Sequence, residues 1–224
     1  MAAQLIPGTR VVGRLGNDAA SVVAIHATWR AGCSLITAST MVPEAEVTRR
    51  ATETGAASLL TPDRDGGLGS RVEHTGMSRS APAGEAVVMF TSGTTGTPKG
   101  ASLTFAALRG SLVGIASGAG LEDSGRPPRV PARGPRLVLL PIAHMGGLLG
   151  TLTAWWLGKP VLLAPKFSPR FVIEMAHRYR LGVLGMTPAM VWELVQLDED
   201  AALPGVDQAT VGTASLPEAA RLTF

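Results

Sequence analysis

The chain has 224 residues, of which 46% are hydrophobic and 17% are charged, and its formal net charge is +3. This length and composition suit one substantial domain or two small ones, and they exclude an intrinsically disordered chain. The positive charges are spread thinly, with no dense basic run, so the sequence predicts no nucleic-acid partner.

The sequence also bears on the cell compartment. Its single cysteine, Cys33, excludes an internal disulfide and is typical of a reducing compartment, and the first residues lack a secretory signal. Residues 137–157 form a run of 21 without a formal charge, but Pro141 and three glycines divide it into a short strand and a helix. We therefore expect a cytoplasmic protein with no transmembrane span, for which peripheral contact with a membrane stays open.

Strands and helices alternate in the first part of the chain. The expected elements are strands over 10–15, 34–37 and 58–61, a helix that Asn17 or Asp18 caps, and a helix over 43–54 that Gly55 stops. Residues 62–84 are rich in Gly, Ser, Asp and Arg, so we expect a surface connection there.

The same alternation continues to the end of the chain. We expect strands over 86–90, 137–140, 161–164, 183–186 and 209–213, and helices over 103–117, 147–157, 168–180 and 189–197. Apolar strands that alternate with helices predict an α/β fold with mostly parallel sheets flanked by helices. In such folds ligands bind at the loops that leave the carboxyl ends of the strands.

One of these loops has an unusual composition. The strand over 86–90 leads into a run of hydroxyl residues and glycines with one lysine, before the helix over 103–117: Thr91, Ser92, Gly93, Thr94, Thr95, Gly96, Thr97 and Lys99. Glycines let backbone N–H groups point at a ligand, hydroxyls add donors, and a lysine supplies a point charge for phosphates. The loop therefore predicts a polyphosphate site, although it lacks the spacing of a Walker loop.

These residues carry a family resemblance. The segment "FTSGTTGTPKG" resembles the phosphate-loop signature of the adenylate-forming (AMP-binding) enzymes of the acyl-CoA synthetase type. The segment "LLPIAHMGGL" is similar to that family's Pro-x-x-His-x-x-Gly motif, through Pro141, His144 and Gly147. The end of the chain resembles a stretch near the nucleotide, through Gly212, Thr213 and Ala214.

The resemblance implies a reaction and its participants. A carboxylic acid, with a fatty acid as the first expectation, would be joined to AMP from ATP and then passed to coenzyme A. Lys99 and His144 would be catalytic, the loop from Thr91 to Lys99 and the segment Gly212, Thr213 and Ala214 would bind the nucleotide, and Thr91 would lie near Mg²⁺. His144 would border the acid. The partners implied are thus small molecules.

The chain also departs from the family pattern. We expect residues 1–84 and 85–224 to be two subregions of a partial N-terminal domain, with the family's C-terminal mobile domain absent. Several nucleotide and metal motifs are missing, so we expect this chain alone to be weak or inactive as a ligase, with a complementing C-terminal fragment as a partner. Two alternatives stay open: a fragment of an adenylation enzyme or aryl-acid ligase, and a non-catalytic nucleotide-binding remnant or half of a split enzyme.

Overall fold

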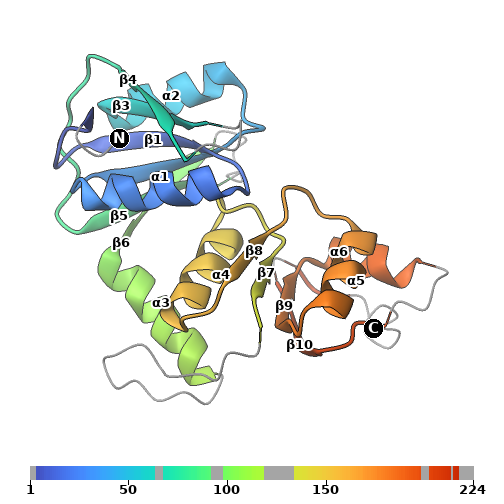
Figure 1. The fold of residues 1–224 in the computed structure, drawn as a ribbon. Helices are drawn as coiled ribbons and strands as arrows, with labels where there is room; N and C mark the ends of the chain where they lie inside the picture. The colour runs from blue at the N-terminus through green and yellow to red at the C-terminus, as the bar shows by residue number, and fades with distance from the viewer. Residues whose placement is uncertain are drawn as a thin grey trace. The chain divides into compact units, whose positions relative to one another are not determined.

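A computed structural model describes residues 4–63, 68–91, 98–118, 134–197, 202–212 and 214–216. The chain forms two compact units (Figure 1). The first comprises Met1–Ser111 and Ile142–Met145, and the second comprises Leu112–Pro141 and Gly146–Phe224. The units divide within a helix, so the expected subregions 1–84 and 85–224 stay a prediction about the larger domain.

The first unit contains a six-stranded sheet. Its strands are β1 (Arg10–Leu15), β2 (Ser34–Ser39), β3 (Ser58–Pro62), β4 (Ser70–His74), β5 (Glu85–Thr91) and β6 (Lys99–Thr104). They lie in the order β4-β3-β1-β2-β5-β6. The four inner strands run parallel, and the edge strands β4 and β6 pair antiparallel with their neighbours. The expected mostly parallel sheet is therefore confirmed.

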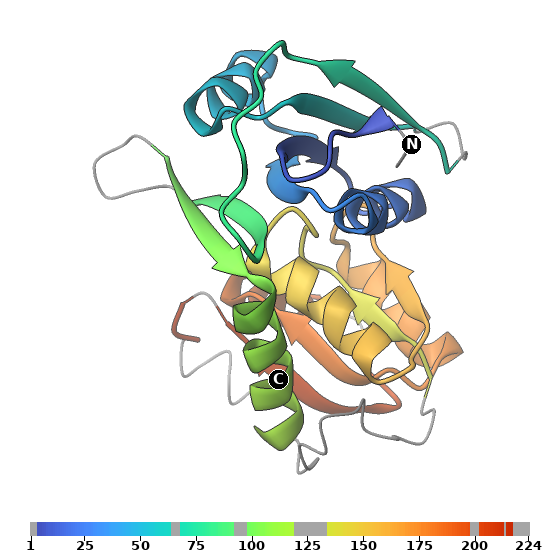
Figure 2. The same cartoon turned by 90° about the vertical axis from the view of Figure 1, so that its left-hand side faces the viewer.

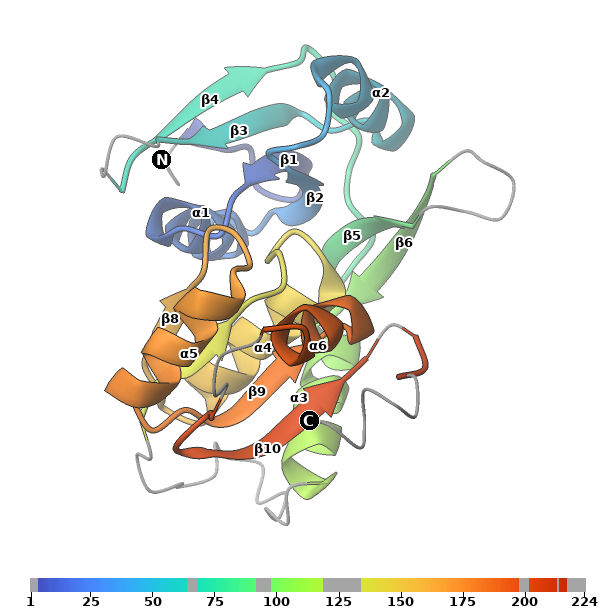
Figure 3. The ribbon, with the colours of Figure 1, turned by 90° about the vertical axis from the view of Figure 1, so that its right-hand side faces the viewer.

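Helices cover both faces of this sheet. The helices α1 (Ala19–Arg30) and α2 (Glu44–Thr54) lie on opposite faces (Figures 1 and 3). The expected cap of α1 is confirmed, because the Asp18 side chain accepts a hydrogen bond from the Ser21 N–H. Gly55 ends α2 in the left-handed conformation with φ 65°, as expected of a glycine at this position. A core of Val, Ile and Ala side chains packs α2 onto β1, β2 and β5.

Two strands were not predicted from the sequence. Strand β4 lies within the expected surface connection, and β6 follows the phosphate loop where a helix was expected to come next. The loop therefore joins the two strands of an antiparallel hairpin, and the helix α3 (Phe105–Gly118) begins directly after β6 (Figure 2). Both strands lie at sheet edges and are largely exposed, so neither carries the apolar pattern of a buried strand.

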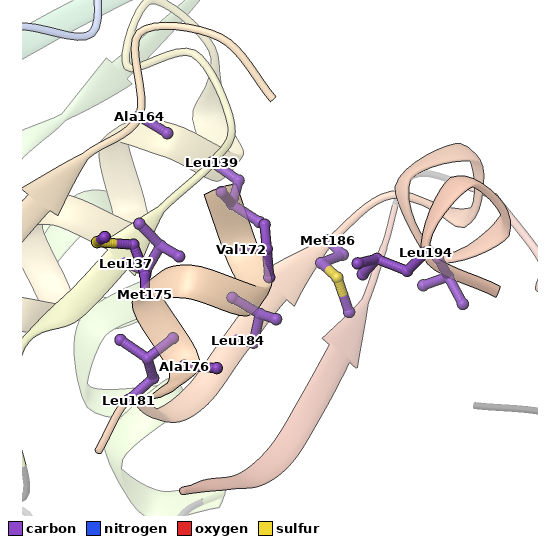
Figure 4. Close-up of a cluster of buried hydrophobic side chains, with 11 residues drawn as sticks. Leu137, Leu139, Ala164, Val172, Met175, Ala176, Leu181, Leu184, Met186 and Leu194 are labelled. Atoms are coloured by element: carbon purple, nitrogen blue, oxygen red, sulfur yellow. The ribbon is translucent and has the colours of Figure 1, made fainter. Parts of the chain in front are cut away.

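The second unit contains two pairs of parallel strands. Strand β7 (Arg136–Val138) pairs with β8 (Val161–Leu163), and β9 (Gly182–Met186) pairs with β10 (Val206–Val211). Its helices are α4 (Met145–Trp156), α5 (Pro169–Arg178) and α6 (Pro188–Val195). Figure 4 shows a core to which β7, β9, α5 and α6 contribute, where Leu137 from β7 and Leu184 from β9 are 1% and 0% exposed.

The uncharged run 137–157 divides as expected into a strand and a helix. Strand β7 covers its start and α4 spans 12 residues of its remainder. Across the described parts of the chain, no helix has the length and apolar character needed to cross a membrane.

Candidate functional site

The candidate site lies at the carboxyl edge of the six-stranded sheet. Strands β1, β2 and β5 run parallel, so their last residues Leu15, Ser39 and Thr91 lie at the same edge. The turns after β1 and β2 are in contact, because the Thr40 N–H donates to the Leu15 carbonyl oxygen at 3.1 Å. Ligands of parallel α/β sheets bind at such an edge.

The two ends of the predicted phosphate loop meet at this edge. Thr91 and Lys99 occupy directly opposite positions of the β5–β6 hairpin, and both are exposed. The Thr91 Oγ1 atom lies 3.5 Å from the Lys99 carbonyl oxygen, at the outer limit of a hydrogen bond. Within the described ranges, no carboxylate forms an ion pair with the Lys99 ammonium group. A hydroxyl and a cation thus flank the loop.

Next to the loop ends, the β5–β6 hairpin packs a glycine closely against an aromatic ring. Gly100 lies opposite Phe90, and a Cβ atom on Gly100 would lie 3.0 Å from the Val88 Cγ1 atom. The Phe90 ring lies on the α2 side of the sheet, with the Arg50 guanidinium 4.6 Å from its centroid. The expected loop residues Ser92, Gly93, Thr94, Thr95, Gly96 and Thr97 lie outside the described residues.

The His144 segment returns to the first unit. The Ile142 N–H donates to the Asn17 Oδ1 atom, in the turn after β1, at 2.8 Å. Ile142 and Ala143 are 1% and 4% exposed, whereas the His144 side chain is exposed. The segment is therefore anchored at the same sheet edge as Thr91. One strand, β2, lies between β1 and β5, which places their ends roughly 10 Å apart.

Two of the other expected nucleotide residues belong to the second unit. Gly212 follows β10, and its N–H donates to the Met186 carbonyl oxygen at the end of β9, at 3.2 Å. Gly212 and Ala214 are both exposed, and Thr213 lies outside the described residues. Thr187 caps α6 at this same edge, because its side chain accepts from the Met190 N–H. Gly212 and Ala214 are therefore described only by their position within the second unit.

The described residues suit a metal ion that arrives with a nucleotide. Among them, no group of three or more His, Cys, Asp or Glu side chains could hold an ion. Mg²⁺ commonly keeps several waters and takes its remaining oxygens from substrate phosphates and one or two protein groups. The exposed Thr91 hydroxyl fits that limited role, so the donor set is compatible with Mg²⁺ on a polyphosphate.

An ion pair that sequence reasoning missed lies at the opposite, amino edge of the sheet. Arg10 Nε and Nη2 donate to the two Glu85 carboxylate oxygens at 2.7 and 2.9 Å, and Ser102 Oγ donates to Oε2 at 2.6 Å. Burial alone would raise the pKa of Glu85, but the hydrogen bonds from Arg10 and Ser102 outweigh burial and hold that pKa at about 2. The ion pair joins β1 to β5, and the hydrogen bond from Ser102 adds β6. Arg10 and Glu85 are 75 residues apart, so no local sequence signal indicates their contact.

The fold and the edge site together define a class of protein. It is an α/β protein with a mostly parallel sheet between helices, and the exposed residues Thr91 and Lys99 lie at the carboxyl edge of that sheet. The family model described as "AMP-binding enzyme" matches residues 70–224, well over half of the sequence. The chain therefore belongs to the AMP-binding enzyme family.

Solved structures and a curated relative agree with this assignment. O-succinylbenzoate coenzyme A synthetase (MenE) from Bacillus subtilis, in complex with AMP, matches with a TM-score of 0.77 and 22% identity, over 99% of this chain and 59% of that one. ATP-bound MatB from Rhodopseudomonas palustris matches with a TM-score of 0.77 and 21% identity, over 99% and 48%. The 2-succinylbenzoate–CoA ligase of Bacillus licheniformis is 27% identical over 197 residues, which are 80% of this chain and 39% of that relative.

These matches confirm the expected fold class, a partial N-terminal domain of the adenylate-forming type. They also show that the chain spans 39% of the length of the curated relative and 59% of the AMP-bound synthetase.

Proposed function

We propose that this chain binds ATP with Mg²⁺ at the carboxyl edge of its six-stranded sheet and acts as part of an adenylate-forming coenzyme A ligase. The observation that supports the proposal is the pairing of Thr91 with Lys99 at the two ends of the predicted phosphate loop. A triphosphate requires neutralising charge and many hydrogen-bond donors, and this edge offers an exposed lysine next to glycines and hydroxyl residues.

In the proposed reaction, a carboxylate oxygen of the acid attacks the α-phosphorus of ATP. The bond to the leaving pyrophosphate breaks, and an acyl adenylate remains, from which the thiol of coenzyme A takes the acyl group and releases AMP. Lys99 neutralises charge that develops on the pyrophosphate, and Thr91 offers its hydroxyl beside Mg²⁺. Mg²⁺, when bound, shares the phosphate charge. In this proposal, His144 has the role of bordering the acid. Gly212, Thr213 and Ala214 are kept as nucleotide-binding residues, as the family resemblance implies.

The acid is proposed to be an aryl carboxylate. The expectation of a fatty acid came from resemblance alone, whereas the curated relative and the AMP-bound synthetase both bear names of succinylbenzoate–CoA ligases. The comparisons thus favour the aryl-acid alternative. Because the chain spans only part of these proteins, the complete ligase reaction, with coenzyme A and a complementing C-terminal fragment, is proposed as well.

Removal of the Lys99 ammonium group tests the nucleotide site. We expect Lys99→Ala to weaken binding of Mg²⁺-ATP by about tenfold or more, since hydrogen bonds from a charged donor contribute about 1.5–3 kcal/mol. Lys166→Ala, which removes an exposed lysine of the second unit, serves as the matched control and should bind as the wild type does. Calorimetry measures the affinities, and unchanged thermal unfolding excludes a folding defect. Equal affinities in the two variants would contradict the assignment.

Acid-dependent exchange of labelled pyrophosphate into ATP tests the chemistry. Comparison of 2-succinylbenzoate, benzoate and decanoate should show the greatest exchange with an aryl acid. Greater exchange with decanoate would restore the fatty-acid expectation. Binding of ATP without exchange for any acid, both by the chain alone and with a C-terminal fragment added, would favour the second candidate function, a nucleotide-binding protein without ligase activity.

A further inference from the structure

Asn17 is the single asparagine of the chain, and it lies in the turn between β1 and α1. Its Oδ1 atom accepts a hydrogen bond from the Ile142 N–H at 2.8 Å, although 125 residues separate the two in sequence. His144 lies two residues after Ile142 in the same turn. One side-chain amide thus connects the first strand of the sheet to the segment that carries the histidine.

The turn around Asn17 is held on both sides. The Gly16 N–H donates to the Ser21 hydroxyl at 2.9 Å, and the Ser21 N–H donates to the Asp18 carboxylate at 2.7 Å. A Cβ atom on Gly16 would come 2.5 Å from the Asp18 Oδ2 atom, so a side chain there would require the Asp18 carboxylate to shift. These contacts fix the backbone that presents Asn17, and a fixed backbone orients its amide in advance.

The partner segment depends on this contact. Ile142–Met145 belongs to the first unit, although the chain on either side of it belongs to the second. Ile142 lies in a turn and not in a strand or helix, so Asn17 supplies the acceptor that a strand neighbour would otherwise supply. Because Ile142 is 1% exposed, loss of this acceptor leaves a buried N–H without its partner.

We propose that Asn17 is a positioning residue that holds the Ile142–Met145 segment at the carboxyl edge of the sheet, and so sets the place of His144 relative to Thr91. This inference rests on the proposed function for the role of His144. The hydrogen bond between Asn17 and Ile142 is the part of it that can be tested without any ligand.

Amide exchange measures the contact directly. The chain has six isoleucines, so selective ¹⁵N labelling gives six backbone signals, and Ile142→Val identifies the signal of Ile142. We expect Asn17→Ala to speed hydrogen exchange at Ile142 by about fivefold or more, which is the effect of losing one net hydrogen bond. Exchange at Ile25 and Ile36, which lie in α1 and β2, should stay as in the wild type.

Two further variants distinguish loss of the Asn17–Ile142 hydrogen bond from a general loss of stability at this edge. Asn17→Asp keeps an acceptor oxygen and should keep Ile142 protected. Ser39→Ala removes a hydrogen bond of the same kind at the same edge, from the Met41 N–H to the Ser39 hydroxyl, and should leave Ile142 unchanged. Unchanged exchange at Ile142 in Asn17→Ala, or equal acceleration by Ser39→Ala, would overturn the inference.

Addition of Mg²⁺-ATP tests whether the position matters to the site. In the wild type, the Ile142 signal should shift as Mg²⁺-ATP binds, and in Asn17→Ala this shift should fall by half or more at saturation. An identical shift in both proteins would overturn the positioning role. If the wild type binds no Mg²⁺-ATP, the proposed function fails by itself, and the exchange rates still decide whether Asn17 holds the segment.

Discussion

Gly147 is the residue at which the Pro-x-x-His-x-x-Gly segment has no space for a side chain. It lies in the first turn of α4, and a Cβ atom there would overlap the carbonyl oxygens of Leu140 and Pro141. Those are backbone atoms, which cannot move aside as the end of a side chain can. The motif therefore needs glycine at this position for steric reasons, independent of any ligand.

Alanine at Gly147 should destabilise the protein. We expect Gly147→Ala to lower the free energy of unfolding by about 1–3 kcal/mol, the usual cost of forcing atoms into a packed region. Gly150→Ala in the same helix is the matched control, because its Cβ atom would lie 3.8 Å from the Val138 Cγ2 atom, an ordinary contact. That control should gain up to about 1 kcal/mol from helix propensity. Urea unfolding measures both, and equal effects would contradict the steric explanation.

Site residues differ in how far sequence could place them. The local pattern predicted that the loop from Thr91 to Lys99 follows a buried strand, but it did not predict that Lys99 begins a strand opposite Thr91, which the register shows. The contact of Asn17 with Ile142 joins positions 125 residues apart in sequence, and no periodicity or capping signal indicates a contact between residues so far apart in the chain. Their roles in binding and catalysis stay predictions.

At the scale of secondary structure, the predicted elements that were confirmed have local causes. Asp18 caps α1 and Gly55 ends α2, and both signals depend on residues within one helical turn. Strands β4 and β6 escaped prediction because an exposed edge strand gains its stability from ladder hydrogen bonds to a neighbour, not from an apolar pattern. Which strand an edge strand pairs with is determined by the tertiary structure.

The ion pair of Arg10 with Glu85 ties β1 to β5, Ser102 of β6 adds a hydrogen bond to Glu85, and the cluster should make stability depend on pH. The pKa of Glu85 is about 2 in the folded protein, against an ordinary value of 4.5. Its stabilising contribution is therefore complete above pH 4.5 and is lost as the pH falls towards 2. Glu85 is 1% exposed on its side chain, so we expect Glu85→Gln to cost about 3 kcal/mol at pH 7.

Urea unfolding of wild type and Glu85→Gln at a series of pH values measures this contribution. The difference between the two proteins should shrink steadily between pH 4.5 and 2. Glu46→Gln is the control: hydrogen bonds from Arg49 lower the pKa of Glu46 to about 2 as well, but its side chain is 22% exposed on the surface of α2. The control should lose less stability at pH 7. A difference for Glu85→Gln that stays constant with pH would contradict the linkage.

The whole molecule has two compact units, and each has a hydrophobic core of its own. One core packs α2 onto β1, β2 and β5, and the other packs α5 and α6 with β7 and β9. The chain passes between the units after Ser111, after Pro141 and after Met145. The chain thus crosses between the units three times, and each core is packed from strands and helices of its own unit.

Truncation of one core should therefore act mainly on its own unit. Leu184 is 0% exposed in the second core, and we expect Leu184→Ala to cost about 2–5 kcal/mol and to speed amide exchange at Ile173 in α5. Exchange at Ile36 in the first unit should change much less. Leu60→Ala, at a buried position of β3, should show the reverse pattern. If both variants speed exchange at Ile36 and Ile173 by the same factor, the two units unfold together, because local opening of either core then requires global unfolding.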